Sequence, residues 1–322
     1  MMVNGTCVNT PTVPINGTFA ASLTGLFSLI AIIWLSQSMY KQRQFSKPKF
    51  LSIAVCFTDL MFAGISNSLL LASRWLGYCA MGGDTGCTIR GFCRSSIMVT
   101  AQMMVLFMTI ERYIALRFPF RYQQLLPPRR ILITTFSIYV YSILLSTLPF
   151  MGVNSYGYDY WCDFHWNDTS PAGRSFVFYI LLQGTGCMLF TIFCNISVIY
   201  EVLAIKRRVD LANRKQSFKE EVEHIKFIII MGLVSVLYII CTAPYLVRLA
   251  CNQFGFDISR DKDALAVKLN IFNSMSNSYL ILFIQVLFHS KVMEIIRACY
   301  GRSSEGNNTN HSEMHTSEVV IQ

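Results

Sequence analysis

The stretch TIRGFCRSSIMVTAQMMVLFMTIERYIAL, residues 88–116, decides the fold. It is longer than the roughly 20 residues that a helix needs to cross a hydrocarbon layer ~30 Å thick. The charged residues Glu111 and Arg112, followed by Tyr113, come near its end, where charged side chains can reach water. The stretch therefore predicts a membrane-spanning helix that ends at an ion pair.

Comparable apolar runs occur throughout the chain, at about residues 20–40, 50–74, 130–152, 175–205, 225–251 and 264–287. The 322 residues are 53% hydrophobic and only 14% charged. A water-soluble core of this size could not hide that many apolar side chains, so lipid must receive many of them. We predict an all-α membrane protein, a seven-transmembrane helix bundle over residues 20–287.

The positions of lysine and arginine predict the orientation, because cytoplasmic loops retain positive charge. One set of loops is clearly richer, with Lys41, Arg43, Lys47, Lys49, Arg117, Arg121, Arg129, Arg130 and a cluster from Lys206 to Lys226. The N-terminus is then extracellular and the protein a multi-pass plasma-membrane protein. The net charge of +9 lies in short clusters and not along a polar stripe, so no nucleic-acid partner is expected.

The ends of the chain have their own expected roles. Residues 1–19 form an extracellular segment with glycosylation sequons at Asn4 and Asn16, and a third sequon, Asn167, falls in an outer loop. Residues 288–300 have the spacing of an amphipathic juxtamembrane helix. Its Cys299 is either a palmitoylation site or an unmodified cysteine. Residues 301–322 are polar and are expected to be a disordered cytoplasmic tail with phosphorylation sites, which makes arrestin and receptor kinases candidate partners.

Other classes of membrane protein lack support. The eleven cysteines show no spacing typical of metal ligands, so we expect neither a metal site nor a cofactor. No histidine-glutamate metal motif or nucleophile elbow indicates an enzyme. Duplicated halves with paired glycine and proline breaks, which would indicate a transporter, are also missing.

Polar residues at mid-membrane depth form a second group of candidates, because intramembrane carboxylates are costly and usually functional. Asp59 lies in the second span, and Asn273 and Asn277 lie in the seventh. The alternative is that they form interhelical hydrogen bonds that only aid packing. Pro244 removes a backbone hydrogen bond inside the sixth span and is expected to kink it, although such prolines are common in membrane helices.

The outer third of the bundle is rich in cations: Arg74, Arg90, Arg94, Arg248 and Lys268. No matching acids lie at similar depth in the same helices, so these cations predict a pocket for a ligand with a carboxylate or phosphate. Arg74 and Arg248 could instead reach outward to the lipid headgroups. Lys268 is the favoured ligand contact.

Glu111-Arg112-Tyr113, followed by Pro119-Phe120-Arg121-Tyr122, resembles the rhodopsin-like G-protein-coupled receptors. The resemblance implies that Glu111 holds Arg112 at rest and that released Arg112 meets a heterotrimeric G protein. It implies a sodium- and water-binding role for the Asp59 cluster and a disulfide between Cys87 and Cys162. A helix-end charge pair without a switching role is the alternative for Glu111 and Arg112. Arg94 stands about where amine receptors carry aspartate, which disfavours a biogenic amine.

Two longer segments resemble the prostanoid receptors, the subtype-four prostaglandin E2 type in particular. They are Cys241-Thr242-Ala243-Pro244-Tyr245-Leu246-Val247-Arg248 and Tyr160-Trp161-Cys162-Asp163-Phe164. Lys268 falls where that family keeps the arginine that pairs with the prostaglandin carboxylate. The resemblance implies a receptor for an acidic lipid, prostaglandin E2 or a related prostanoid, with its chains beneath Trp161 and beside Tyr160. Coupling to Gs and cyclic AMP is the expected route.

The chain also departs from that family. Lys268 replaces arginine, Ile271 replaces a serine, and Tyr160 replaces a threonine. Asn277-Ser278 replaces Asp-Pro, and Ser28 replaces asparagine. These departures leave one alternative function, an orphan or non-coupling receptor-like protein that binds a different anionic ligand.

Overall fold

The structure, a computed structural model, describes residues 2–3, 6–7, 15–43, 45–77, 79–158, 162–212, 218–256 and 259–290. The chain divides into two compact units, Met1–Leu280 and Ile281–Gln322. All of the contacts described below lie within the first unit.

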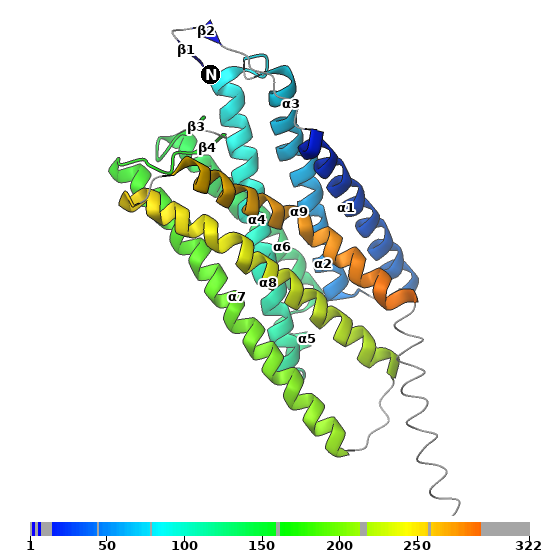
Figure 1. Cartoon of the computed structure of the whole chain (residues 1–322). Helices are drawn as coiled ribbons and strands as arrows, with labels where there is room; N and C mark the ends of the chain where they lie inside the picture. Colours follow the sequence, from blue (N-terminus) through cyan, green and yellow to red (C-terminus); the bar gives the residue numbers. More distant parts are fainter. Residues whose placement is uncertain are drawn as a thin grey trace, which may run out of the picture. The chain divides into compact units, whose positions relative to one another are not determined.

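Long helices account for most of the described chain, and each predicted span corresponds to one helical stretch (Figure 1). These stretches are α1 (Ile15–Gln42), α2 with the π-helix η1 and α3 (Lys47–Met61, Phe62–Asn67 and Ser68–Leu76), α4 (Gly83–Arg117), α6 with the 3₁₀ turn η2 (Pro128–Thr147 and Leu148–Met151), α7 (Pro171–Ala212), α8 (Phe218–Phe254) and α9 (Arg260–Ser290). The short α5 (Tyr122–Leu125) lies in the loop between α4 and α6. The seven stretches predicted from hydropathy are therefore all helical.

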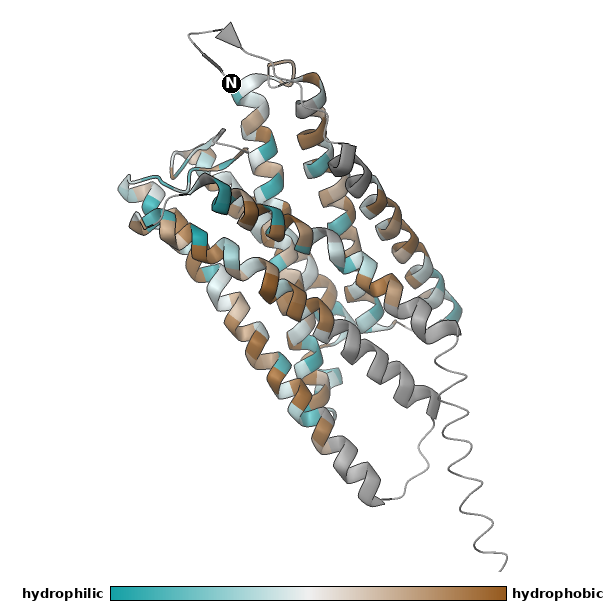
Figure 2. Cartoon of the chain, viewed as in Figure 1, coloured by the Kyte–Doolittle hydropathy of each residue, from teal (hydrophilic) through white to brown (hydrophobic). Residues whose placement is uncertain are grey.

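Six of the stretches are long and apolar enough to cross a membrane, judged by length and composition over the described residues. Hydrophobic residues run along the helical ribbons in Figure 2. Large apolar side chains remain exposed on the helices, among them Phe136 (70%), Leu182 (74%) and Ile196 (63%). Such surfaces are stable in hydrocarbon and unfavourable in water.

The helix α4 contacts more of the bundle than its neighbours do. It packs against α2, η1, α6, α7, α8 and both strands of the outer loop. Met104 and Met108 on α4 are almost completely buried, as expected for a helix surrounded on several sides. In the outer half, Val99 of α4 joins an apolar cluster with Trp166, Val177, Tyr245 and Leu249. The core at this level thus joins α4, α7, α8 and the loop before α7.

The outer loop between α6 and α7 folds as a hairpin. Strand β3 (Tyr156–Tyr158) pairs antiparallel with β4 (Cys162–Phe164). A disulfide joins Cys162 of β4 to Cys87 of α4, which confirms the pairing expected from the sequence. A second pair of strands, β1 (Met2–Val3) and β2 (Thr6–Cys7), lies near the N-terminus.

Two predicted boundaries differ from the structure. Helix α1 begins at Ile15, so Asn16, predicted to lie in an extracellular segment, is in its first turn. Residues 288–290 belong to α9, whereas the sequence predicts that a separate juxtamembrane helix begins at residue 288. The rest of that predicted helix, with Cys299, and the predicted tail lie outside the described residues, as does Asn4.

We expect Cys87→Ala to destabilise the purified protein by about 2–5 kcal/mol, because the disulfide restricts the unfolded chain and holds the hairpin on α4. The measurement is the apparent melting temperature in detergent. Cys251→Ala is the matched control, since Cys251 is a free, half-buried cysteine. Equal melting temperatures for Cys87→Ala and wild type would contradict the structural role of the disulfide.

Candidate functional site

A cavity opens between the helices on the side of the bundle that carries the β3–β4 hairpin, and it is called the outer cavity below. Residues from α4, β4, α7, α8 and α9 line it: Arg94, Ser95, Met98, Val99, Gln102, Asp163, Phe164, Ile180, Tyr245, Leu246 and Asn270. About half of these side chains are apolar, and polar or charged side chains lie among them. Ligand sites in helical bundles commonly have this composition.

The hairpin covers the α4 side of this cavity because three contacts hold it there. The first is the disulfide between Cys87 and Cys162. The second is the ring of Tyr156, which lies so close to Gly91 of α4 that a Cβ at residue 91 would come within 2.6 Å of it. The third is a hydrogen bond of 2.8 Å from the Tyr156 hydroxyl to the carbonyl of Ser146. Glycine at residue 91 thus allows the loop to approach the helix backbone.

Arg94 brings a buried positive charge to the cavity, and β4 supplies its counterion. Nη1 of Arg94 lies 3.5 Å from Oδ2 of Asp163, and the two side chains are only 10% and 8% exposed. Nε of Arg94 is buried and has no hydrogen-bond acceptor within the part of the chain that the structure describes. The guanidinium therefore keeps one donor that the described part of the chain does not use.

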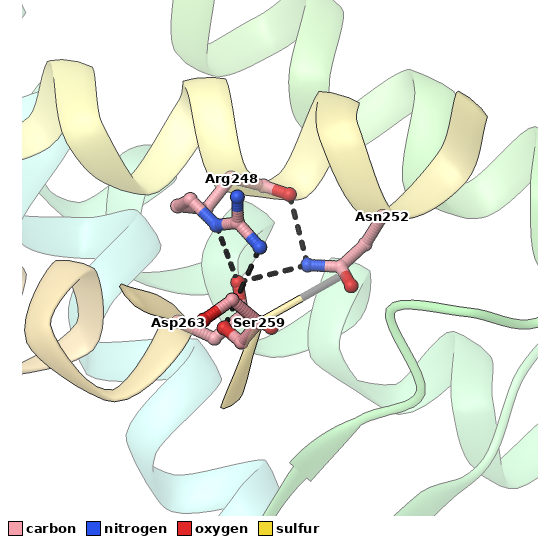
Figure 3. Close-up of polar contacts among 4 residues, drawn as sticks. All are labelled: Arg248, Asn252, Ser259 and Asp263. Carbon is pink, nitrogen blue, oxygen red and sulfur yellow. Dashed lines mark hydrogen bonds and ion pairs between the residues drawn. The ribbon is translucent and has the colours of Figure 1, made fainter. Parts of the chain in front are cut away.

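Arg248 has a different environment, shown in Figure 3. Its Nε donates to Oδ1 of Asp263 over 2.7 Å, and Nδ2 of Asn252 donates to the same oxygen over 3.0 Å. Nη2 of Arg248 also reaches the carbonyl of Ser259 at 3.5 Å. The cluster joins the outer ends of α8 and α9, so Arg248 serves as an interhelical contact.

These two pairs correct one inference from the sequence. Arg94 and Arg248 were expected to lack acidic partners, because their own helices carry no acids at that depth. The partners come instead from β4 and from the start of α9, as Asp163 and Asp263. Arg90 is buried as well, and its Nε donates to the carbonyl of Gly86 one turn earlier in α4. It does not line the outer cavity.

Lys268 lies on the opposite side of α9 from the cavity. Two residues along a helix correspond to a rotation of about 200°, and Asn270 is the α9 residue that lines the cavity. Lys268 is exposed, as are Leu265 and Phe272 on the same side of the helix. The structure therefore does not bring Lys268 together with Arg94.

Other ligand contacts expected from the sequence lie outside the description. Tyr160 and Trp161 are not among the described residues, and for Arg74 only the helical backbone is described.

Some residues that line the cavity were not predicted from the sequence. Gln102 and Asn270 had no expected role, and Tyr245 had none beyond its place in a motif. The indole of Trp166 packs edge-on against Tyr245 with ring centroids 5.2 Å apart, and Gln253 donates to the Trp166 carbonyl. In the sequence, only the positions of Gln102, Tyr245 and Asn270 along their predicted helices could have indicated that they line the cavity.

The mid-membrane cluster forms around Asp59. Its Oδ2 accepts hydrogen bonds from the backbone N–H of Ser278, at 2.9 Å, and from the Ser278 hydroxyl, at 2.8 Å. Nδ2 of Asn277 lies 3.3 Å from Oδ1, while Asn273 is buried nearby on α9. Ser28 of α1 donates to Ser278 over 2.9 Å. One carboxylate thus connects α1, α2 and α9.

Two of the residues that depart from the prostanoid pattern, Ser28 and Ser278, are both part of this cluster. A proline at residue 278 could donate neither of the two hydrogen bonds that Ser278 makes to Asp59. The replacement of Asp-Pro by Asn277-Ser278 therefore has a structural consequence, since it provides the carboxylate with donors from the helix that faces it.

The C-terminal end of α4 holds the predicted ion pair. Nε of Arg112 lies 3.1 Å from Oε2 of Glu111, and the Glu111 side chain is completely buried. The hydroxyl of Tyr122, in α5, donates to the other oxygen of Glu111. Burial, and then the charge of Glu111, raises the pKa of Tyr122, so this phenol stays a neutral donor. Lys47 lies over the Tyr122 ring, 3.9 Å from its centroid.

The remaining predicted residues occupy places consistent with their helices. Tyr113 is half-buried, and its ring lies 6.1 Å from that of Phe193 on α7. Pro244 is inside α8, as predicted. Asn167 is exposed in the loop that follows β4.

We expect Asp263→Asn to lower the stability of the unliganded protein by about 3–5 kcal/mol, because it leaves Arg248 buried without its counterion. Thermal unfolding in detergent measures this, with Asp261→Asn as the control, since Asp261 is an exposed acid in the same first turn. A loss no larger than that of the control would show that the pair contributes little.

Residues 28–302 match the model of the 7 transmembrane receptor (rhodopsin family). The human prostaglandin E2 receptor EP4 subtype is 21% identical over 334 residues, which span 90% of this chain and 68% of that receptor. The human prostacyclin receptor is 26% identical over 247 residues, 73% of this chain and 63% of that receptor.

The crystal structure of squid rhodopsin shares the fold, with a TM-score of 0.72 at 18% identity over 89% of this chain and 80% of that one. The seven-helix architecture predicted from hydropathy is thereby confirmed, including α9 as the seventh helix. Proteins of this family are multi-pass membrane receptors that signal through heterotrimeric G proteins, and they are not enzymes. The chain belongs to the rhodopsin family of seven-transmembrane receptors.

Proposed function

We propose that this receptor binds an acidic lipid, prostaglandin E2 or a related prostanoid, in the outer cavity. One observation carries the proposal: Arg94 is buried in the cavity wall with Nε lacking an acceptor within the described chain. A buried guanidinium with an unused donor favours a carboxylate, to which arginine binds with strong charge-assisted hydrogen bonds. The similarity to receptors named for prostaglandin E2 and prostacyclin supports the same ligand class.

The residues that line the rest of the cavity have side chains of the right chemistry to contact the body of such a ligand. Met98, Val99, Phe164, Ile180 and Leu246 provide apolar contacts for hydrocarbon chains. Gln102 and Asn270 offer amide groups for the ring oxygens and side-chain hydroxyl of a prostanoid.

The orientation that we propose follows the positive-inside rule. The basic loops would be cytoplasmic, and the cavity, the disulfide and exposed Asn167 would be extracellular. Glycosylation of Asn4, Asn16 and Asn167 and palmitoylation of Cys299 remain predictions from the sequence.

Coupling through Gs to cyclic AMP is the signalling route that we propose, with arrestin and receptor kinases acting on the tail. At rest, Glu111 would hold Arg112 with the help of Tyr122, and agonist binding would move α8 about Pro244. The Asp59 cluster would transmit the movement of α9 and is where sodium and water would bind.

The Ser278–Asp59 contacts favour one alternative, a receptor that binds a ligand without coupling. Two hydrogen bonds from Ser278, together with that from Asn277, stabilise the contact between α2 and α9 in this conformation. If that contact persisted with agonist bound, α9 could not move. Ligand binding without G-protein activation in cells would identify this case.

The proposed ligand class can be tested with prostaglandin E2, its methyl ester and lysophosphatidic acid on cells that express the receptor. We expect prostaglandin E2 to raise cyclic AMP and its methyl ester to bind more weakly, since the ester has no charge for Arg94. Cyclic AMP and calcium are read in parallel, with untransfected cells as control. Absence of binding by every acidic lipid in a wider panel would contradict the proposal.

Two substitutions separate the candidate cations. Arg94→Gln should weaken prostaglandin E2 binding about ten- to a hundredfold, as loss of a charged hydrogen-bond partner costs about 1.5–3 kcal/mol. Lys268→Gln tests the ligand contact favoured by the sequence, and the exposed position of Lys268 predicts a smaller loss. A larger loss for Lys268→Gln than for Arg94→Gln would assign the carboxylate to Lys268.

Basal signalling tests the cytoplasmic ion pair. Tyr122→Phe removes the hydroxyl that donates to buried Glu111, so we expect Arg112 to be held less tightly and ligand-free cyclic AMP to rise a few-fold. Glu111→Gln should raise it further, because the charge itself is removed. Phe120→Ala, at a 96% exposed residue of the same loop, is the control. Unchanged basal signalling in both variants would leave the pair as a packing feature only.

A further inference from the structure

The charges of the outer cavity are balanced before any ligand binds. Among the described residues that line it, Arg94 carries a positive charge and Asp163 a negative one. Both side chains are nearly buried, and they face each other at 3.5 Å. An acidic ligand would therefore enter a cavity that already holds a carboxylate beside its arginine.

Asp163 is held in this place by the loop itself. It pairs with Gly157 across the hairpin, and the preceding residue, Cys162, is bonded to α4. Oδ1 of Asp163 accepts a hydrogen bond of 3.0 Å from the N–H of Phe164, and Oδ2 lies 3.5 Å from Nη1 of Arg94. The backbone at residue 163 is thus held by the disulfide and the hairpin pairing, which keeps the carboxylate within reach of Arg94.

The Arg94–Asp163 contact is looser than the other buried pair. Arg248 and Asp263 form a hydrogen bond of 2.7 Å, within the usual range for charged partners, whereas 3.5 Å between Arg94 and Asp163 exceeds it. Within the described residues, Nε of Arg94 has no acceptor, whereas Asp263 accepts hydrogen bonds from both Arg248 and Asn252. The first pair is suited to exchange of partners, and the second is suited to a fixed contact.

A second carboxylate at Arg94 would place two negative charges beside one cation in a space with little water. Like charges repel strongly there, because the effective dielectric constant is low. An acidic ligand must then displace Asp163 from Arg94 or bind against its repulsion. Either course lowers the affinity for acids relative to a cavity with a neutral residue at position 163.

We propose that Asp163 is a built-in counterion of Arg94 that competes with the carboxylate of an acidic ligand and so sets the receptor's selectivity for acids. The inference rests on the proposed ligand class and adds a residue that controls it. Asp163 lowers the affinity for acids that make few other contacts, so only a ligand whose apolar body also fits the cavity displaces it from Arg94. In this role Asp163 is a specificity-determining residue and not the ligand's anchor.

The test compares wild type with Asp163→Asn for binding of prostaglandin E2 and of its methyl ester to purified receptor. Asparagine keeps Oδ1 as an acceptor for the Phe164 N–H and removes only the charge. We expect about tenfold tighter binding of the acid and little change for the ester. Asp163→Glu, which keeps the charge, should bind like wild type, and Asp261→Asn controls for loss of an exposed outer acid. Asp163→Ser is the second neutral variant if Asp163→Asn folds poorly.

The outcomes distinguish this inference from the proposed function. If wild type binds prostaglandin E2 and the neutral variants bind it no tighter, the counterion role is overturned while the ligand class stands. If the neutral variants bind prostaglandin E2 and wild type does not, the counterion role is supported, because the charge of Asp163 then prevents binding of the acid. If neither binds any acid, both proposals fail.

Discussion

The attachment of the outer hairpin to α4 is the constraint on which the outer half of the receptor depends. The disulfide between Cys87 and Cys162 and the close approach of Tyr156 to Gly91 hold β4 over the helix. With β4 in that place, Asp163 and Phe164 become walls of the cavity. Helix α4 in turn contacts α2, α6, α7 and α8, so a loop fixed on α4 is fixed relative to most of the bundle.

Burial of charge in a low-dielectric environment explains how the polar residues are arranged. A charge without a partner is costly there, and the structure provides partners from segments distant in sequence. Arg248 meets Asp263 across two helix ends, Arg94 meets Asp163 across a loop, and Arg112 meets its neighbour Glu111. The tightness of these pairs differs, and that difference separates contacts that hold helices together from a contact that a ligand could exchange.

Two residues that depart from the prostanoid pattern contact each other in the structure. Ser28 and Ser278 lie far apart in sequence, yet they form one hydrogen-bonded chain that ends at Asp59. Residues that look like isolated substitutions in the sequence therefore act as partners in shared contacts.

The sequence alone determined the helices, because runs of apolar residues long enough to span lipid have few other stable structures, and lysine and arginine clusters indicated the orientation. It also identified Glu111 and Arg112, which are neighbours in the chain, and its family resemblance led to the disulfide. Only the tertiary structure decided which charges meet. Asp163 and Asp263 lie on segments whose depth and direction depend on loop folding and helix packing, and hydropathy carries no information on either. The rotation of α9, which directs Asn270 to the cavity and Lys268 away from it, is likewise set by side-chain packing between helices.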